Sequence, residues 1–284
     1  MRKYYEFAGV GLALQLPDGE DFSEGRELPA FACAPRDGMT ECAVRIADGF
    51  VIPDGKLRAA LPNMREYDCG GTVVRIFGAL AQDIENVGFI SEYRENSINI
   101  TLKRSVYCKI TAYTMLEALG AERLVTKAGG VILHSAFIDI GGKAILFTAP
   151  SGTGKSTQAE LWRKYRGATV INGDKSVLRI IDGIPSASGL PYSGSSGISL
   201  NRTLPLMAIV YLEQAKENTV TCLRGFSAFR KVWEGVCVNT WDAEMTGAAS
   251  DTVGTMLSSV PVYKLCCTPD IRAVEALEKA LSCN

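Results

Sequence analysis

The chain has 284 residues, 47% of them hydrophobic, and can therefore bury a core in one large domain or in two smaller ones. Its 30 Lys and Arg residues nearly balance its 31 Asp and Glu residues, which argues against nucleic acid and anionic membranes as partners. No apolar run has the length of a membrane span, and residues 1–7 do not form a signal-peptide core, so we expect a cytoplasmic protein.

Residues 1–105 alternate short apolar runs with turn-forming residues. The apolar runs cover 4–16, 42–46, 72–80 and 97–102, with Pro-Asp-Gly and Gly-Gly sequences between them. This alternation is typical of β-strands joined by turns. We therefore predict a smaller, β-rich N-terminal domain over residues 1–105, whose role no motif assigns.

A helix is predicted at residues 107–124, where the composition changes to helix-forming residues. Apolar side chains recur there at helical spacing, and Gly120 is a suitable stop. We place the junction between two domains at this helix and assign residues 106–284 to the second domain.

The second domain has the elements of a nucleotide-binding fold. In chain order they are strand 131–138, strand 144–148, a helix over 155–165, and strands 168–171 and 176–181. The first two strands flank Gly141-Gly142, which predicts a hairpin. The order strand, glycine loop, helix, strand is typical of a mononucleotide-binding α/β unit. A last helix is predicted to begin near Pro269 and to serve the core.

The segment 149–157, Ala-Pro-Ser-Gly-Thr-Gly-Lys-Ser-Thr, fits the P-loop pattern except that its first glycine is alanine. Glycines allow the backbone amides to turn around phosphates, and Lys155 and Ser156 would reach the β and γ phosphates and Mg²⁺, respectively. The alternative is a glycine-rich turn that only caps a helix. We expect ATP to be bound by Ser151, Gly152, Thr153, Gly154, Lys155, Ser156 and Thr157.

A phosphoryl-transfer site also needs a carboxylate that holds the metal or accepts a proton. Asp174 follows the apolar strand 168–171, and ligands of α/β sheets bind at such strand ends. The alternative for Asp174 is a turn residue. His134 lies in the strand before the loop strand, and an isolated histidine on an apolar strand is more often structural.

Residues 134–174 resemble the catalytic core of the HPr kinase/phosphorylase family, whose fold is related to that of phosphoenolpyruvate carboxykinases. The resemblance covers about residues 105–284. It implies that residues 106–284 form an α/β kinase core and that the whole chain, with its β-rich N-terminal domain, is of the α+β class. It also implies that His134 lies at the phosphate site, that Lys155 and Ser156 bind ATP and Mg²⁺, and that Asp174 is the base or the metal carboxylate.

Two departures set this chain apart from that family. The family usually has paired aspartates, whereas this chain has Gly173-Asp174, and its arginine-glycine signature is replaced here by the serine-rich stretch 189–199. The chain is more similar to the HPr-kinase-like proteins associated with peptide-modification systems. We expect the serine-rich stretch and a nearby arginine to contact the transferred phosphate or the acceptor, unless they form only a solvated surface loop. The candidate residues are Ser193, Ser195, Ser196 and Arg202.

The sequence thus predicts an ATP-dependent kinase that phosphorylates a hydroxyl group of a peptide, a protein serine or a small alcohol. An alternative is a nucleotide-dependent peptide-binding module without transfer, which the missing second aspartate favours. A carboxykinase-like enzyme acting on an oxoacid is a third alternative, but no arginine-rich substrate motif supports it. The identity of the acceptor and homo-oligomerisation stay open.

Overall fold

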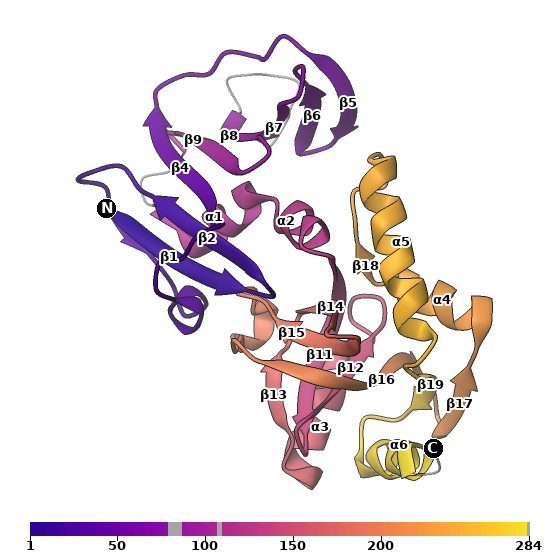
Figure 1. The fold of residues 1–284 in the computed structure, drawn as a ribbon. Helices are drawn as coiled ribbons and strands as arrows, with labels where there is room; N and C mark the ends of the chain where they lie inside the picture. The colour runs from indigo at the N-terminus through magenta and orange to yellow at the C-terminus, as the bar shows by residue number, and fades with distance from the viewer. Residues whose placement is uncertain (79–86, 107–109, 283–284) are drawn as a thin grey trace. The chain divides into compact units, whose positions relative to one another are not determined.

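The computed structural model describes residues 1–78, 87–106 and 110–282, with the backbone alone at Tyr113 and Ser195 (Figure 1). The chain forms two compact units, Met1–Leu124 and Val125–Asn284, here called the N-terminal and C-terminal units. The predicted mixture of helices and strands is confirmed. The division lies later in the chain than the predicted 105/106, because helix α1 (Ala112–Leu119) packs on strands of the N-terminal unit.

The N-terminal unit is built around one eight-stranded sheet with the order β1-β2-β4-β9-β8-β7-β6-β5. Its strands are β1 Arg2–Phe7, β2 Val10–Gln15, β4 Thr40–Ala47, β5 Lys56–Leu61, β6 Met64–Asp68, β7 Val73–Gly78, β8 Val87–Tyr93 and β9 Ser97–Lys103. A short 3-10 helix η1 spans Leu28–Phe31, and two short strands, β3 Phe22–Ser23 and β10 Ile110–Thr111, pair in parallel.

The helix predicted at 107–124 is two helices in the structure, α1 and α2 (Ala121–Lys127). Thr111 caps the start of α1 by accepting a hydrogen bond from the amide of Thr114, and residues 107–109 of the prediction lie outside the described residues. Gly120 ends α1 with φ 60°, a left-handed conformation that suits glycine. The predicted stop at Gly120 is therefore confirmed, and the chain starts a new helix directly after it.

The C-terminal unit contains a mixed sheet. Its strands are β11 Gly130–Ile140, β12 Lys143–Thr148, β13 Thr169–Asn172, β14 Lys175–Ile181, β15 Ile184–Gly189, β16 Thr203–Gln214, β17 Thr219–Leu223, β18 Val236–Cys237 and β19 Val262–Cys267. Strands β12, β16 and β19 are parallel neighbours, so their carboxyl ends meet at one edge of the sheet. In α/β sheets that edge is where ligands bind.

Two long strands, β11 and β16, each pair with different neighbours along their length. The first half of β11 pairs with β14 and its second half with β12, while β16 pairs first with β15 and then with β12 and β19. The predicted hairpin is confirmed as β11 and β12. The strand after the loop helix, β13, pairs antiparallel with β11 and does not lie beside β12.

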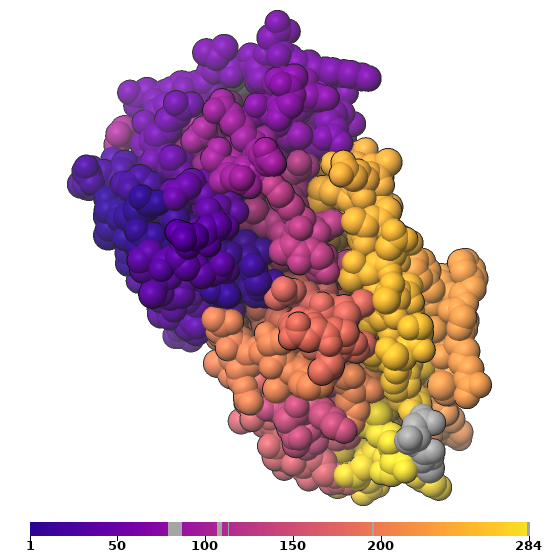
Figure 2. Space-filling view, in the orientation of Figure 1, coloured from indigo at the N-terminus to yellow at the C-terminus, as the bar shows by residue number. Residues whose placement is uncertain are grey.

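Helices cover both faces of the strands around β12. On one face α3 (Lys155–Arg166) and α6 (Ile271–Ser282) pack on Ile145 and Phe147, and on the other α4 (Gly225–Trp233) and α5 (Ala243–Leu257) pack on Leu146. Alternate residues of a strand face opposite sides, so β12 contributes to two cores. Part of the outer surface of α5 is visible in Figure 2.

The predicted helix 155–165 and the last helix are confirmed as α3 and α6. Over residues 1–78, 87–106 and 110–282, no helix has the length and apolar composition needed to cross a bilayer.

Candidate functional site

The candidate site lies at the edge of the sheet where β12 ends. β12 finishes at Thr148, and residues 149–154, here called the glycine loop, lead directly into α3. The neighbouring parallel strand β16 ends beside this loop, because the Nε2 of Gln214 lies 3.4 Å from the carbonyl oxygens of both Gly152 and Thr153. Parallel pairing thus brings a residue distant in sequence to the loop.

The backbone of the glycine loop takes a shape that glycine permits. Gly152 has φ 79° and Gly154 has φ 113°, both in the left-handed region. Gly154 is the N-cap of α3 and offers no side chain to the first amides of the helix. These amides, together with the positive end of the helix dipole, are suited to an anion. Ser151 and Thr153 lie in the loop, and Thr157 lies in the first turn of α3.

Lys155 is the first residue of α3 and is only 7% exposed. Its Nζ donates hydrogen bonds to the carbonyl oxygens of Ala149, at 3.0 Å, and Pro150, at 3.3 Å. Burial lowers the pKa of Lys155, and the negative charge of Asp174 acts in the opposite direction. The ammonium group is therefore held against the loop by loop carbonyls.

Asp174 follows β13 in a turn that Asn172 organises. The Oδ1 of Asn172 accepts hydrogen bonds from the amides of Asp174, at 2.9 Å, and Lys175, at 3.0 Å. On the other side of the turn, the Ser156 hydroxyl lies 3.4 Å from the carbonyl oxygen of Gly173. The Ser156 hydroxyl therefore lies at the turn that carries Asp174.

His134 lies beside Asp174 on β11. Its Nε2 is 3.6 Å from Oδ1 of Asp174, slightly beyond hydrogen-bond length, and its amide donates to the carbonyl oxygen of Gly235 at 2.8 Å. Burial and the positive charge of Lys155 lower the pKa of His134, whereas Asp174 raises it. The neutral imidazole is therefore favoured next to the carboxylate.

The serine-rich stretch 189–199, here called the serine loop, folds onto the turn of Asp174. The Nδ2 of Asn172 donates to the carbonyl oxygens of Leu190, at 2.8 Å, and Tyr192, at 2.6 Å. Within the loop, the short 3-10 helix η3 (Gly194–Ser196) approaches Asp174 so closely that a Cβ at Gly194 would lie 2.7 Å from the Cβ of Asp174. The loop is therefore part of the site.

The three predicted serines lie in or next to η3. Ser193 is buried, and the Ser196 hydroxyl donates to the carbonyl oxygen of Ser193 at 2.6 Å. A Cβ at Gly173 would collide with the side chain of Ser196, so Ser196 fills the space beside Gly173. Ser195 belongs to η3, and its side chain lies outside the described residues.

Arg202 does not join the other site residues. Its Nη1 forms an ion pair with Oδ2 of Asp139 at 2.9 Å, and Asp139 lies opposite Ala144, near the start of β12. This is the end of β12 away from the glycine loop. Arg202 lies there because the chain must return to the amino end of β12 before β16 can run parallel to it.

Sequence reasoning missed two residues of the site, Asn172 and Gln214. Asn172 had a local signal, since an Asn at a strand end before Gly-Asp commonly bonds the following amides. Gln214 had none, because its position depends on the pairing of β16 with β12.

Among solved structures, the chain is similar to a protein described as "Structure of the Hpr(Ser) kinase/phosphatase from Coxiella burnetii". The identity is 12%, the match covers 54% of this chain and 94% of that chain, and the TM-score of 0.30 is too low to show a shared fold. No curated protein matches the chain. The family described as "SynChlorMet cassette protein ScmC" matches over residues 102–282, more than half of the chain, and the chain therefore belongs to this family.

Proposed function

We propose that the C-terminal unit binds ATP with Mg²⁺ and transfers the γ-phosphate to a hydroxyl group. The observation that carries this proposal is the convergence of Lys155, Asp174 and His134 at the glycine loop, with Asp174 and His134 3.6 Å apart. Phosphoryl transfer depends mainly on positioning and on offsetting negative charge, and this cluster offers both.

The loop supports phosphate binding through its backbone and one lysine. The first amides of α3 follow Gly154, which provides no side-chain cap, and the Lys155 ammonium is held at the loop by two carbonyl groups. Phosphate oxygens are stronger acceptors for this ammonium than neutral carbonyls. We expect Lys155 to exchange these carbonyls for the β and γ phosphates.

Ser156 and Asp174 are the residues that would hold the metal. A hydroxyl and a carboxylate oxygen are donors that a hard cation such as Mg²⁺ prefers. In support, the Ser156 hydroxyl lies 3.4 Å from the carbonyl oxygen of Gly173, the residue before Asp174. When bound, Mg²⁺ supplies positive charge that offsets the charge on the transferred phosphate. The protein itself contributes the placement of the two oxygens.

Asp174 is also the residue that would accept the proton of the attacking hydroxyl. In this step the acceptor oxygen forms a bond to the γ-phosphorus, the bond from that phosphorus to the β,γ-bridging oxygen breaks, and ADP leaves. The acceptor proton moves to the Asp174 carboxylate. The neutral imidazole of His134 lies next to this carboxylate and would orient it.

The acceptor class is set by what lies around Asp174. Ser193 and Ser196 belong to the serine loop, which covers this carboxylate on one side. Their hydroxyl groups and the main chain of the loop suit the polar main chain of a peptide, or a small alcohol, more than an apolar substrate. We therefore propose a serine of a peptide or a small alcohol as the acceptor.

The proposal is tested by transfer of γ-labelled phosphate from MgATP into peptides and small alcohols of an extract. Wild-type protein should label an acceptor and Asp174→Asn should not, while both should still bind ATP. Lys155→Ala should lose both ATP binding and labelling, because the point charge at the phosphates is removed. Labelling that persists in Asp174→Asn would refute the role of this carboxylate.

A second candidate is a nucleotide-dependent peptide-binding module without transfer. It is favoured because position 173 has no room for a second aspartate: the side chain of Ser196 fills the space where a Cβ at Gly173 would lie. Asp174 is therefore the one carboxylate of this turn. For this module, ATP binding would still depend on Lys155, no acceptor would be labelled by wild-type protein, and Asp174→Asn would leave peptide binding unchanged.

A further inference from the structure

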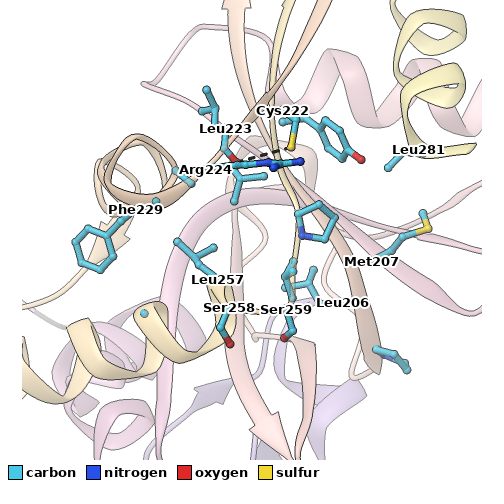
Figure 3. A pocket seen from close by; sticks show the side chains of 18 of the residues that line it. Leu206, Met207, Cys222, Leu223, Arg224, Phe229, Leu257, Ser258, Ser259 and Leu281 are labelled. Carbon is cyan, nitrogen blue, oxygen red and sulfur yellow. Dashed lines mark hydrogen bonds between the residues drawn. The ribbon is translucent and has the colours of Figure 1, made fainter. Parts of the chain in front are cut away.

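A large pocket lies in the C-terminal unit, away from the glycine loop (Figure 3). Its volume is about 980 Å³, in the range of ligand-binding cavities. Most of its wall is apolar, with side chains from β16, α4 and α5. Among these are Leu206, Met207, Phe229 and Leu257.

The pocket opens at the edge of the sheet opposite the candidate phosphate site. It is lined by Lys143, at the start of β12, and by Val262, at the start of β19, whereas the glycine loop follows the other end of β12. The six residues of β12 separate the two places by roughly 16–20 Å at about 3.3 Å per residue. A ligand in this pocket would therefore not touch the phosphate site.

The charges of the pocket are all positive. Lys143 and Arg224 are its only charged lining residues, and both are exposed at the surface. Within the described part of the chain, neither side chain forms an ion pair with an acidic residue. An apolar cavity with two uncompensated cations attracts acidic ligands and repels basic ones.

The two cations lie at strands that are not neighbours in the sheet. Lys143 begins β12 and Arg224 follows β17, and the sheet order β12, β16, β19, β17 separates these strands by three inter-strand steps. At about 4.8 Å per step the separation is roughly 14 Å. An extended peptide covers this span in about four residues, and its residues i, i+2 and i+4 face the same side.

Two residues near the end of β17, Cys222 and Leu223, also line the pocket. A segment bound between the two cations would therefore pass close to the Cys222 thiol.

We propose that this pocket binds an extended acidic peptide segment, with an aliphatic residue in the apolar cavity and acidic residues two positions before and after it. The acidic residues pair with Lys143 and Arg224. This binding needs neither nucleotide nor phosphoryl transfer, so it can be tested without either.

The test is fluorescence anisotropy with the full chain and two labelled, end-capped peptides, Glu-Ser-Leu-Ser-Glu and Lys-Ser-Leu-Ser-Lys. The acidic peptide should bind saturably and the basic peptide should not. Lys143→Glu and Arg224→Glu should each weaken binding of the acidic peptide by about tenfold, since one attractive contact becomes repulsive. Lys164→Glu, a charge reversal on the exposed face of α3, is the matched control and should leave binding unchanged.

Two further measurements test whether charge selects the peptide and whether the peptide binds in this pocket. The double variant Lys143→Glu/Arg224→Glu should prefer the basic peptide, which misfolding would not produce. Bound acidic peptide should slow alkylation of Cys222, as followed by mass spectrometry, and leave Cys69 of the N-terminal unit unaffected. Equal binding of both peptides, an unprotected Cys222, or octanoate that binds while the acidic peptide does not would each overturn the proposal.

Discussion

Gly194 lies directly against the side chain of Asp174: a Cβ at position 194 would be 2.7 Å from the Cβ and 2.9 Å from the Cγ of Asp174. Real Cβ atoms do not approach so closely, so any larger residue must move Asp174 or the serine loop. The residue proposed to accept the proton is therefore positioned by a loop that follows it by 20 residues in the chain.

Gly194→Ala is predicted to reduce phosphate transfer by about 100-fold with little change in ATP affinity, because the reacting carboxylate is displaced while the glycine loop is not. Transfer of labelled phosphate and ATP titration measure the two effects. Gly183→Ala is the matched control: Gly183 also has a positive φ, 79°, but a Cβ there meets no atom within 4 Å. Both variants cost roughly 1 kcal/mol in backbone strain, so equal losses of transfer would contradict the prediction.

Gly173→Ala is predicted to inactivate transfer, because the added Cβ would collide with the Ser196 hydroxyl and lie 2.5 Å from the Ser196 Cβ. Ser196→Gly removes both atoms. The double variant Gly173→Ala/Ser196→Gly should therefore recover activity relative to Gly173→Ala, although Ser196→Gly alone loses the hydrogen bond to the carbonyl oxygen of Ser193. A double-mutant cycle on transfer rates checks the coupling, and strictly additive losses would exclude it.

Asn172→Ala is predicted to lower the free energy of unfolding by about 2–4 kcal/mol, because the fully buried amide makes four hydrogen bonds to the Asp174 turn and the serine loop. Urea denaturation measures the loss.

Asn172→Asp separates the two halves of this network. Its oxygens would still accept from the amides of Asp174 and Lys175, but a carboxylate would face the carbonyl oxygens of Leu190 and Tyr192. The charged form of this carboxyl group is disfavoured, which raises its pKa in the folded protein. The variant should therefore lose more stability at about pH 8 than at about pH 5. A destabilisation that does not depend on pH would argue against the two carbonyl contacts.

The stability of the C-terminal unit is predicted to depend on the protonation of His134. Burial and Lys155 hold the pKa of His134 below its ordinary value of 6.5, so the unfolded chain takes up this proton at higher pH than the folded protein. The contribution of His134 to the free energy of unfolding is therefore fully present above pH 6.5 and decreases as the pH falls from there through the folded pKa.

His134→Asn should remove this dependence. Denaturation of wild type and variant between about pH 8 and about pH 5 isolates the effect, since the other titrating groups are common to both proteins. The difference in free energy of unfolding between wild type and variant should shrink towards low pH. A constant difference would show that His134 has the same pKa in the folded and unfolded chain.

Local sequence was sufficient for the parts of the site that are contiguous. The glycine loop, α3, the β11–β12 hairpin and the place of Asp174 at a strand end all follow from turn chemistry and periodicity within a few residues. Local sequence also predicted that the helix stops at Gly120. It did not predict that a second helix, α2, starts directly after this glycine.

The neighbours of these parts came only from tertiary structure. Which strands lie beside β12 depends on which faces of the strands become buried. The pairing of β16 with β12 brings Gln214 to the glycine loop and places Arg202 at the opposite end of β12. Strand β13 pairs with β11 instead. Strand pairing acts over tens of residues and leaves no periodic signal in a single segment.

The sequence by itself determined a glycine loop between a strand and a helix, with a carboxylate and a histidine nearby in the chain. The tertiary structure decided that the serine loop packs on Asp174, that Arg202 does not, and that an apolar pocket with two cations lies at the far edge of the sheet. The physical reason is that turns and helices are specified by interactions within a few residues, whereas close packing and cavities arise from side chains that only the complete fold brings together.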